Sequence, residues 1–412
     1  MNLTTRRLSL LALAPCALAG MTFLAGCQTW GQVKDEVASP YLDLRSNLIL
    51  QMAESHFEAG QLEIAQKHVN DATKIDPTNP KLYLMDGRIA LERGQLERAM
   101  KLFEVSIQFD EQAAGDSEAA LAQTNPDPHH FQGVIYQRWQ RYDEALEAYG
   151  KAFALERDNP GHLMAMAGAL VPLERTDEAI ALLEEQRTYF DQSSALRASL
   201  GHLYRLQGNH RKAVRAFEEA VTLQPENAKL REELALSQAA AGDHADAASN
   251  LRIVIEDPDS RDRLDLHRLL AQSQIADGQI NAARQTLINL TRRYAAEPDD
   301  WVNLAKLAWR EKDYSATLFA AHNVTQLAPD RPEGYLLAGM VWQHRGNDVN
   351  ALRMFDRAAE LDVDDATPLV LRGVVLQRSG KPEAAALAYR EALQRQPADP
   401  RAKRLLASVE VQ

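Results

Sequence analysis

A 34-residue spacing of small residues constrains this sequence more than any other feature. At one fixed phase, ten successive windows carry glycine or alanine: Ala53, Gly87, Gly133, Ala167, Gly201, Ala235, Ala271, Ala305, Gly339 and Gly373. Twelve residues later, nine of the ten windows carry alanine again, and only the eighth differs, with Thr317. Because helix backbones approach closely only where side chains are small, each window predicts a helix, a tight turn and a second helix.

The fifth window contains the whole repeating unit. Leu200, Gly201 and Tyr204 fall on its first helix, and a turn glycine follows. Ala213, Phe217 and Ala220 fall on the second helix, and a proline closes the unit. This pattern closely resembles the tetratricopeptide repeat family, whose signature places a Leu-Gly pair, an aromatic residue, Ala-x-x-x-Phe and a proline at these spacings. Glycine recurs at the turn position of seven windows: Gly60, Gly94, Gly208, Gly242, Gly278, Gly346 and Gly380.

The resemblance implies an all-α fold, a right-handed superhelical solenoid of about ten helix-turn-helix repeats with a capping helix at its C-terminal end. We expect repeats 1 and 2 over 46–113, an insert over 114–125, repeats 3 to 10 over 126–399 and the capping helix over 400–412. In the capping helix, Leu405, Leu406 and Val409 are the apolar residues that would cover the last exposed face.

Three places depart from the repeat pattern. The insert can be a loop or a helical extension through residues 118–121, and we expect a local bend there rather than two separate domains. In the fourth repeat, Pro172 predicts a first helix that stops early, because proline disfavours a helical residue before it. In the eighth, Lys312 at the turn and Thr317 at the small position predict looser packing.

The N-terminal 26 residues are typical of an export signal. Arg6 and Arg7 precede an apolar stretch from Leu8 to Phe23, and the sequence Leu24-Ala25-Gly26-Cys27 follows. This ending resembles a bacterial lipoprotein signal peptide, which implies that Cys27 becomes the lipidated N-terminus and holds the protein on a membrane. The alternatives are cleavage near residues 17–19, which leaves a free thiol, or an uncleaved anchor helix. Residues 27–45 would then form a flexible lipidated tether.

The cellular location follows from the same segment. Residues 5–10 resemble part of a twin-arginine export signal, although two arginines also serve as an ordinary positively charged region, so the export route stays open. Gln28 is not the aspartate that the lipoprotein resemblance associates with inner-membrane retention. We therefore expect a lipid anchor in the outer membrane, with the repeats facing the periplasm.

Composition and motifs argue against several functions. The chain has 46 basic and 58 acidic residues and a net charge of -12, which disfavours nucleic acid as a partner. We find no phosphate-binding glycine loop, no zinc-binding His-Glu-x-x-His helix and no nucleophile elbow, so we expect neither an enzyme nor a cofactor. His129 and His130 are adjacent, and neighbours on a helix point about 100° apart, so we expect a solvated pair rather than a metal site.

Binding of a protein or peptide is the function that remains. In the tetratricopeptide family the first helices of successive repeats line a concave groove, and the resemblance implies which positions face into it. Mapped onto this chain, the polar and aromatic groove positions are His202, Arg205, Arg268, Gln272, Lys306, Trp309, Arg310, Gln343, His344, Gln377 and Arg378. A basic ladder beside Trp309 could receive a peptide through charged hydrogen bonds and an aromatic anchor. The same residues could also be ordinary solvated positions.

We therefore predict a lipid-anchored scaffold for protein–protein interactions, in the assembly of an envelope machine such as a secretion system, a pilus or a polysaccharide exporter. The machine is an analogy with the family. One alternative is a carbohydrate-binding factor or an envelope enzyme with an unrecognised site in the groove, and another is a purely structural spacer. The sequence leaves the oligomeric state open.

Overall fold

The computed structural model describes residues 29–115, 117–293 and 297–410. Over these residues all regular secondary structure is helical, as the repeat pattern predicts. Within the same residues no helix combines the length and the apolar character that a membrane crossing requires. The predicted export signal, 1–26, and the predicted lipidation site, Cys27, lie outside the described residues.

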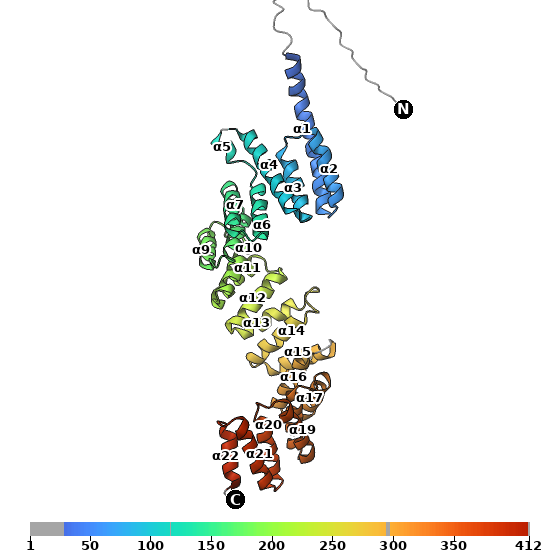
Figure 1. Ribbon diagram of the computed structural model, residues 1–412, viewed down its shortest axis with the longest axis vertical. Coiled ribbons are helices and arrows are strands. Elements are labelled where there is room, and N and C mark those ends of the chain that lie inside the picture. The colour runs from blue at the N-terminus through green and yellow to red at the C-terminus, as the bar shows by residue number, and fades with distance from the viewer. Residues whose placement is uncertain (1–28, 116, 294–296, 411–412) are drawn as a thin grey trace, which may run out of the picture. The chain divides into compact units, whose positions relative to one another are not determined.

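The chain divides into two compact units, with the boundary between Ala169 and Leu170. Unit 1 contains the first eight helices (Figure 1), of which the last ends one residue beyond the boundary. They are α1 Thr29–Glu58, α2 Leu62–Ile75, α3 Pro80–Glu92, α4 Leu96–Ala114, α5 Glu118–Leu121, α6 Asp127–Arg138, α7 Tyr142–Leu155 and α8 Pro160–Leu170.

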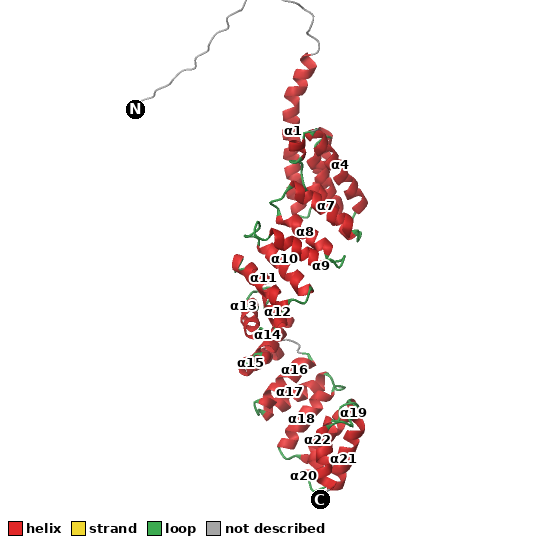
Figure 2. Ribbon diagram, turned by 90° about the vertical axis from the view of Figure 1, so that its left-hand side faces the viewer, coloured by secondary structure: helices red, strands yellow, loops and turns green. Residues whose placement is uncertain are grey.

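Unit 2 contains the remaining helices (Figure 2), of which α10 to α21 pack as pairs along the chain. They are α9 Thr176–Gln186, α10 Ser194–Leu206, α11 His210–Leu223, α12 Ala228–Ala241, α13 His244–Val254, α14 Leu264–Ala276, α15 Ile280–Arg293, α16 Pro298–Arg310, α17 Tyr314–Leu327, α18 Pro332–His344, α19 Asp348–Leu361, α20 Thr367–Arg378, α21 Pro382–Arg395 and α22 Pro400–Glu410. We call the first helix of each repeat its A helix and the second its B helix.

The turn between A and B helices has one backbone conformation throughout. All seven turn glycines have positive φ angles, between 71° and 90°. The three turns without glycine place Gln140, Glu174 and Lys312 in the same left-handed region, at φ angles of 62°, 60° and 63°. The fold therefore imposes the left-handed turn even on residues with a side chain, for which this conformation costs on the order of 1 kcal/mol.

Within the repeats, the small residue of the A helix is matched to the residue sixteen positions later on the B helix. Where the A helix has glycine, the partner is a buried aromatic ring: Phe103, Tyr149, Phe217, Phe355 and Tyr389. Where the A helix has alanine, the partner is a buried aliphatic residue: Val69, Leu183, Leu251, Leu287 and Ala321. A Cβ atom added to Gly201 would lie 2.6 Å from the Phe217 ring, so the ring occupies the space that alanine fills elsewhere.

The structure corrects one expectation about the repeat array and adds detail to two others. Residues 29–45, expected as a flexible tether, belong to α1, because little in this stretch opposes a helix other than Gly31 and Pro40. The insert is helical at both ends, since α4 extends to Ala114 and α5 covers 118–121. The division into units falls in the fourth repeat and not at the insert. There α8 ends two residues before Pro172, as predicted.

Two other expectations concern the later repeats. The looser packing expected at Thr317 is wrong, because this side chain is fully buried and its hydroxyl donates to the Asp313 carbonyl at 2.8 Å. At the C-terminal end, α22 buries Ala402 and Val409 against α20 and α21, with Leu405 and Leu406 partly buried beside them. The predicted capping helix is confirmed.

We expect Gly201→Ala to lower the free energy of unfolding by about 1–2 kcal/mol, because the new methyl group overpacks the Phe217 ring by more than its helix propensity gains. Adding Phe217→Leu reproduces the Ala235 and Leu251 combination of the next repeat. The double variant should therefore be more stable than the sum of the two single changes predicts. Denaturant unfolding of the four proteins measures this coupling, and strict additivity would contradict the matched packing.

A cluster of histidines forms a polar contact inside unit 1. His130 Nδ1 lies 3.0 Å from His162 Nδ1, and His162 Nε2 lies 2.9 Å from Glu156 Oε2. His162 is buried, and the His130 ring also packs beside Tyr149. When the Glu156 carboxylate accepts from Nε2 of a neutral His162, His162 Nδ1 accepts the hydrogen bond that His130 Nδ1 donates. The solvated pair expected for His129 and His130 is therefore wrong.

Burial and the neighbouring His162 hold the pKa of His130 below its ordinary value of 6.5. The unfolded chain then binds more protons than the folded one once the pH falls below about 6.5. We expect the stability of unit 1 to decrease as the pH falls from 7.5 to 5.5. Hydrogen exchange of the α6 and α8 amides measures this loss, which should be smaller in His130→Gln; equal protection at both pH values would contradict it.

Candidate functional site

The A helices of consecutive repeats lie next to each other within each unit. In unit 2, α16 contacts α18, α18 contacts α20, and α20 contacts α22. Side chains from different repeats can therefore act together on the face that these helices share. The predicted groove residues of unit 2 lie on α10, α14, α16, α18 and α20, all of them A helices.

Three of the predicted groove arginines form ion pairs within unit 2. Arg205 Nη1 donates to Glu233 Oε2 at 2.6 Å, which links α10 to α12. Arg268 donates from Nε and Nη2 to the two carboxylate oxygens of the buried Asp300, each at 2.9 Å, which links α14 to α16.

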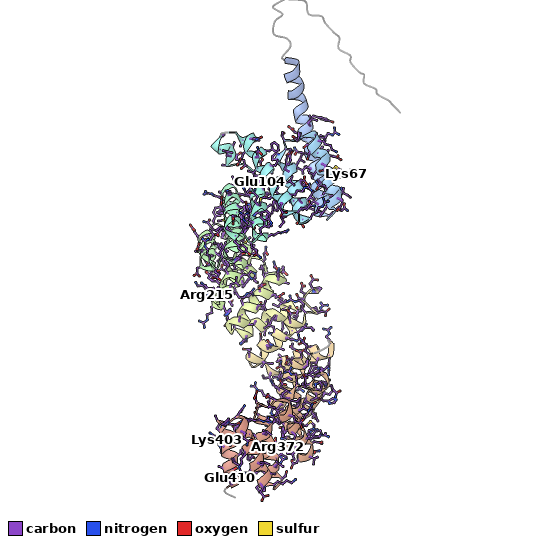
Figure 3. All side chains as sticks on the ribbon, in the orientation of Figure 1. Lys67, Glu104, Arg215, Arg372, Lys403 and Glu410 are labelled. Atoms are coloured by element: carbon purple, nitrogen blue, oxygen red, sulfur yellow. The ribbon has the colours of Figure 1, made fainter. Side chains whose placement is uncertain are left out.

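Arg378 pairs with Asp348 and donates from Nη1 to the Gln343 carbonyl at 3.0 Å. Arg372 of α20, labelled in Figure 3, also pairs with carboxylates on both sides, Asp356 and Glu391. The idea of a continuous free basic ladder is therefore wrong. In these positions the positive charge is paired with a carboxylate of a neighbouring helix.

Three further predicted residues also make internal contacts. His202 Nδ1 lies 3.0 Å from Arg205 Nη2, and burial keeps the pKa of this histidine below its ordinary value, so it accepts this hydrogen bond as a neutral ring. The Gln377 side chain accepts from the hydroxyl of the buried Tyr389 at 3.0 Å. The Gln343 side chain is partly exposed beside the carbonyl that receives Arg378.

Three polar groove residues stay exposed. Lys306 and Arg310 lie on α16, one turn apart, and neither forms an ion pair with a carboxylate among the described residues. Gln272 of α14 is exposed as well. The positive charge that remains accessible along the predicted groove is therefore concentrated at the eighth repeat.

An aromatic cluster stands beside these two cations. Tyr314, the first residue of α17, packs edge-on against Trp309 of α16, with ring centroids 5.3 Å apart. On its other side it stacks on the exposed His344 of α18 at 3.9 Å. Tyr314 was not predicted, because family positions on A helices identify no residue of a B helix. The available signal was its position five residues after Trp309 in the sequence, across the left-handed turn at Lys312.

We call Lys306, Trp309, Arg310, Tyr314 and His344 the α16–α18 patch. It combines two cations that can donate hydrogen bonds to a carboxylate with an aromatic surface that can cover an apolar or planar group. Elsewhere on the described residues, no group of three or more histidine, cysteine, aspartate or glutamate side chains has an arrangement that could hold a metal ion. The patch is thus suited to binding a peptide side chain or terminus.

Arg268 and Arg310 should respond differently to replacement by alanine. Arg268→Ala leaves the carboxylate of Asp300 buried without its bidentate partner, so we expect a loss of about 3 kcal/mol in the free energy of unfolding. Arg310→Ala removes an exposed side chain without an ion pair and should change stability by less than about 0.5 kcal/mol. Thermal or denaturant unfolding compares the two variants, and equal losses would mean that the assignment of structural and free cations is wrong.

Comparison with known families identifies the repeats. Models of the tetratricopeptide repeat match residues 50–117, 140–203, 199–261 and 370–412. Together the matched segments span more than half of the chain. The match includes the fourth repeat, in which the structure divides the chain into two units.

Among curated proteins, the chain is 30% identical over 97 residues to small glutamine-rich tetratricopeptide repeat-containing protein 2 of Mycosarcoma maydis, which covers 24% of this chain and 28% of that protein. It is 23% identical over 195 residues to a DnaJ homolog subfamily C member 7 homolog of Schizosaccharomyces pombe, which covers 44% of this chain and 39% of that protein. The chain thus spans well under half the length of these relatives.

Solved structures with a similar arrangement include the C-terminal part of a repeat protein from Cytophaga hutchinsonii. It is 15% identical with a TM-score of 0.49, covering 59% of this chain and 99% of that one. Another is YrrB, described as a tetratricopeptide repeat protein with an unusual peptide-binding site. It is 17% identical with a TM-score of 0.40, and the match covers 46% of this chain and 97% of YrrB.

Proposed function

This chain is a tetratricopeptide repeat protein, and we propose that it is a scaffold whose partner docks on the α16–α18 patch. The observation that carries the proposal is the contrast along the groove. Arg205, Arg268 and Arg378 are held by carboxylates of their own unit, whereas Lys306 and Arg310 form no ion pair with the described residues and lie beside a partly exposed aromatic cluster. Binding energy at protein interfaces concentrates at such aromatic and arginine positions.

The chemistry of the patch favours a peptide segment that carries a carboxylate. Arg310 can donate two hydrogen bonds to one carboxylate, and Lys306 adds a second positive charge one turn away. Trp309 and Tyr314 supply the apolar surface for a neighbouring side chain. A neutral glycan could stack on the rings but would gain little from the two cations, so charge reversal separates the two kinds of ligand.

Photo-crosslinking in cells tests this site directly. With p-benzoylphenylalanine at position 310, we expect an adduct with a partner protein that is absent with the same residue at Val349, which is 80% exposed on α19. Trp309→Ala should weaken the adduct at least tenfold as the loss of an aromatic anchor, while Phe319→Ala, an exposed aromatic of α17, should not. Equal adducts at positions 310 and 349 would overturn the proposed site.

The charge reversals complete the test. With the captured partner in hand, Lys306→Glu and Arg310→Glu should each weaken binding, and added salt should weaken the wild-type complex in the same direction. A partner that binds the doubly reversed protein as tightly as wild type would exclude a carboxylate ligand. It would place the contact with this partner away from the two cations.

We further propose that the scaffold is lipid-anchored through Cys27 in the outer membrane and faces the periplasm, where it supports assembly of an envelope machine. The sequence Leu24-Ala25-Gly26-Cys27 after an apolar segment supports the anchor. More than one acyl chain at Cys27 would hold the protein stably, because a single chain anchors only marginally.

Mass spectrometry tests the anchor. Expressed with its signal in a Gram-negative host, the wild-type protein should start at Cys27 and carry the added mass of lipid. Cys27→Ser should remove this mass and leave the protein either uncleaved or cut elsewhere and soluble. A wild-type protein without lipid at Cys27 would overturn both the anchor and the proposed outer-membrane location, while the proposed peptide site would stand.

A further inference from the structure

Two B helices of unit 2 are shorter than the others, and a hollow lies beside each. α9 and α13 have 11 residues, whereas α11, α15, α17, α19 and α21 have 14. The difference is close to one helical turn. The larger hollow, of about 630 Å³, is enclosed by α9, α10 and α11, and the smaller one, of about 470 Å³, lies between α13 and α15. Both volumes are typical of sites that hold a small molecule.

Charged side chains line the larger hollow, which we call the α9–α11 pocket, around the buried Leu200 and Ala216. Four of these side chains are cations and two are carboxylates, which leaves an excess of two positive charges in a chain whose net charge is -12. The six residues are Glu184, Arg187, Arg197, Lys212, Arg215 and Glu219. The pocket is thus a local basic site in an acidic protein.

The two carboxylates are held by an internal network. Glu184 Oε1 accepts from the Tyr204 hydroxyl at 2.7 Å, and Arg187 Nη1 donates to Glu184 Oε2 at 3.3 Å. Glu219 pairs with Arg187 and, at 3.1 Å, with Nε of the buried Arg197. Burial and the neighbouring Glu184 raise the pKa of Tyr204 to about 12, so its hydroxyl stays a donor at neutral pH. Each carboxylate is therefore fixed by two donors from within the unit.

Lys212 and Arg215 account for the positive excess. Both are exposed, they lie one turn apart on α11, and neither forms an ion pair with a carboxylate among the described residues. Arg215 is labelled in Figure 3, and Lys212 Nζ lies 5.0 Å from the centre of the Tyr204 ring. Lys212 does not stabilise α11 either, because a cation in the first turn of a helix is unfavourable. The fold therefore leaves two cations at this pocket that its own ion pairs do not use.

We propose that the α9–α11 pocket binds a small organic dianion, which carries two carboxylates or one phosphate on a short carbon skeleton. Two negative charges match the two cations that the internal network leaves unpaired. Arg215 can donate two parallel hydrogen bonds to one anionic group, and Lys212 supplies a mobile point charge beside it. Leu200 and Ala216 offer apolar surface to the carbon skeleton.

The shape of the pocket favours a small molecule over a peptide chain. Helices bound the hollow on three sides, whereas a peptide that runs along the repeats needs an open groove. The pocket also shares no residue with the α16–α18 patch. The proposed dianion site therefore stands or falls independently of the proposed partner site.

Calorimetric titration tests the pocket with two probes, succinate for a dicarboxylate and glucose 6-phosphate for a phosphate. The full-length chain, purified in detergent, would be titrated at a pH of about 7.5, where both probes are dianions. We expect one-to-one binding of at least one probe with a Kd below about 1 mM. Succinamate and glucose, which keep the skeletons but lose one or both charges, should bind at least about fivefold more weakly.

Two results of this titration would overturn the proposal. One is a wild-type protein that binds neither dianion at concentrations up to about 10 mM. The other is a protein that binds succinamate or glucose as tightly as the corresponding dianion, because charge would then not be what the site recognises.

Charge variants of the lining should change the Kd in opposite directions. Lys212→Glu with Arg215→Glu should raise the Kd at least about tenfold, because it replaces both unpaired cations by anions. Glu184→Gln should lower the Kd about threefold, because it increases the positive excess while the amide oxygen still accepts from Tyr204. A protein that has lost its fold cannot bind more tightly, so the Glu184 variant separates an effect of charge from one of misfolding.

Arg353 provides the matched control. It is exposed on α19 at the repeat position that Arg215 occupies on α11, and Arg353→Glu should keep the Kd within about twofold of the wild-type value. Circular dichroism verifies the helical content of each variant. A Kd unchanged by the double reversal would place the dianion outside the pocket, and a Kd raised by Glu184→Gln would contradict the charge balance; either result would overturn the proposal.

Discussion

The contact between the small residue of each A helix and the matched side chain of its B helix determines the rest of this structure. Glycine is paired with an aromatic ring and alanine with an aliphatic side chain, so most repeats keep a similar volume between their two helices, although in the eighth Ala305 meets only Ala321. Every repeat also keeps the left-handed turn, even at Lys312, where it costs backbone strain. A regular stack follows because every repeat then presents the same surfaces to its neighbours.

The regular stack also decides which polar side chains are left for binding. Where consecutive A helices touch, a cation of one repeat comes within reach of a carboxylate of the next, as with Arg268 and Asp300. Most groove arginines form ion pairs with carboxylates of neighbouring helices. Where the carboxylate is buried, the pair is costly to break. At the eighth repeat no acidic side chain meets Arg310 among the described residues, so the α16–α18 patch keeps its charge.

The sequence alone predicts the repeats, the turns and the capping helix, because each rests on a residue type that few other structures need at that spacing. It predicts the groove only as a set of positions. Whether Arg205 is free depends on Glu233, a residue of another repeat, and this information is not in the pattern of any one repeat. The same limit hid His162, which meets His130 from a different repeat. Tyr314 was missed for another reason, because it lies on the B helix of the same repeat as Trp309.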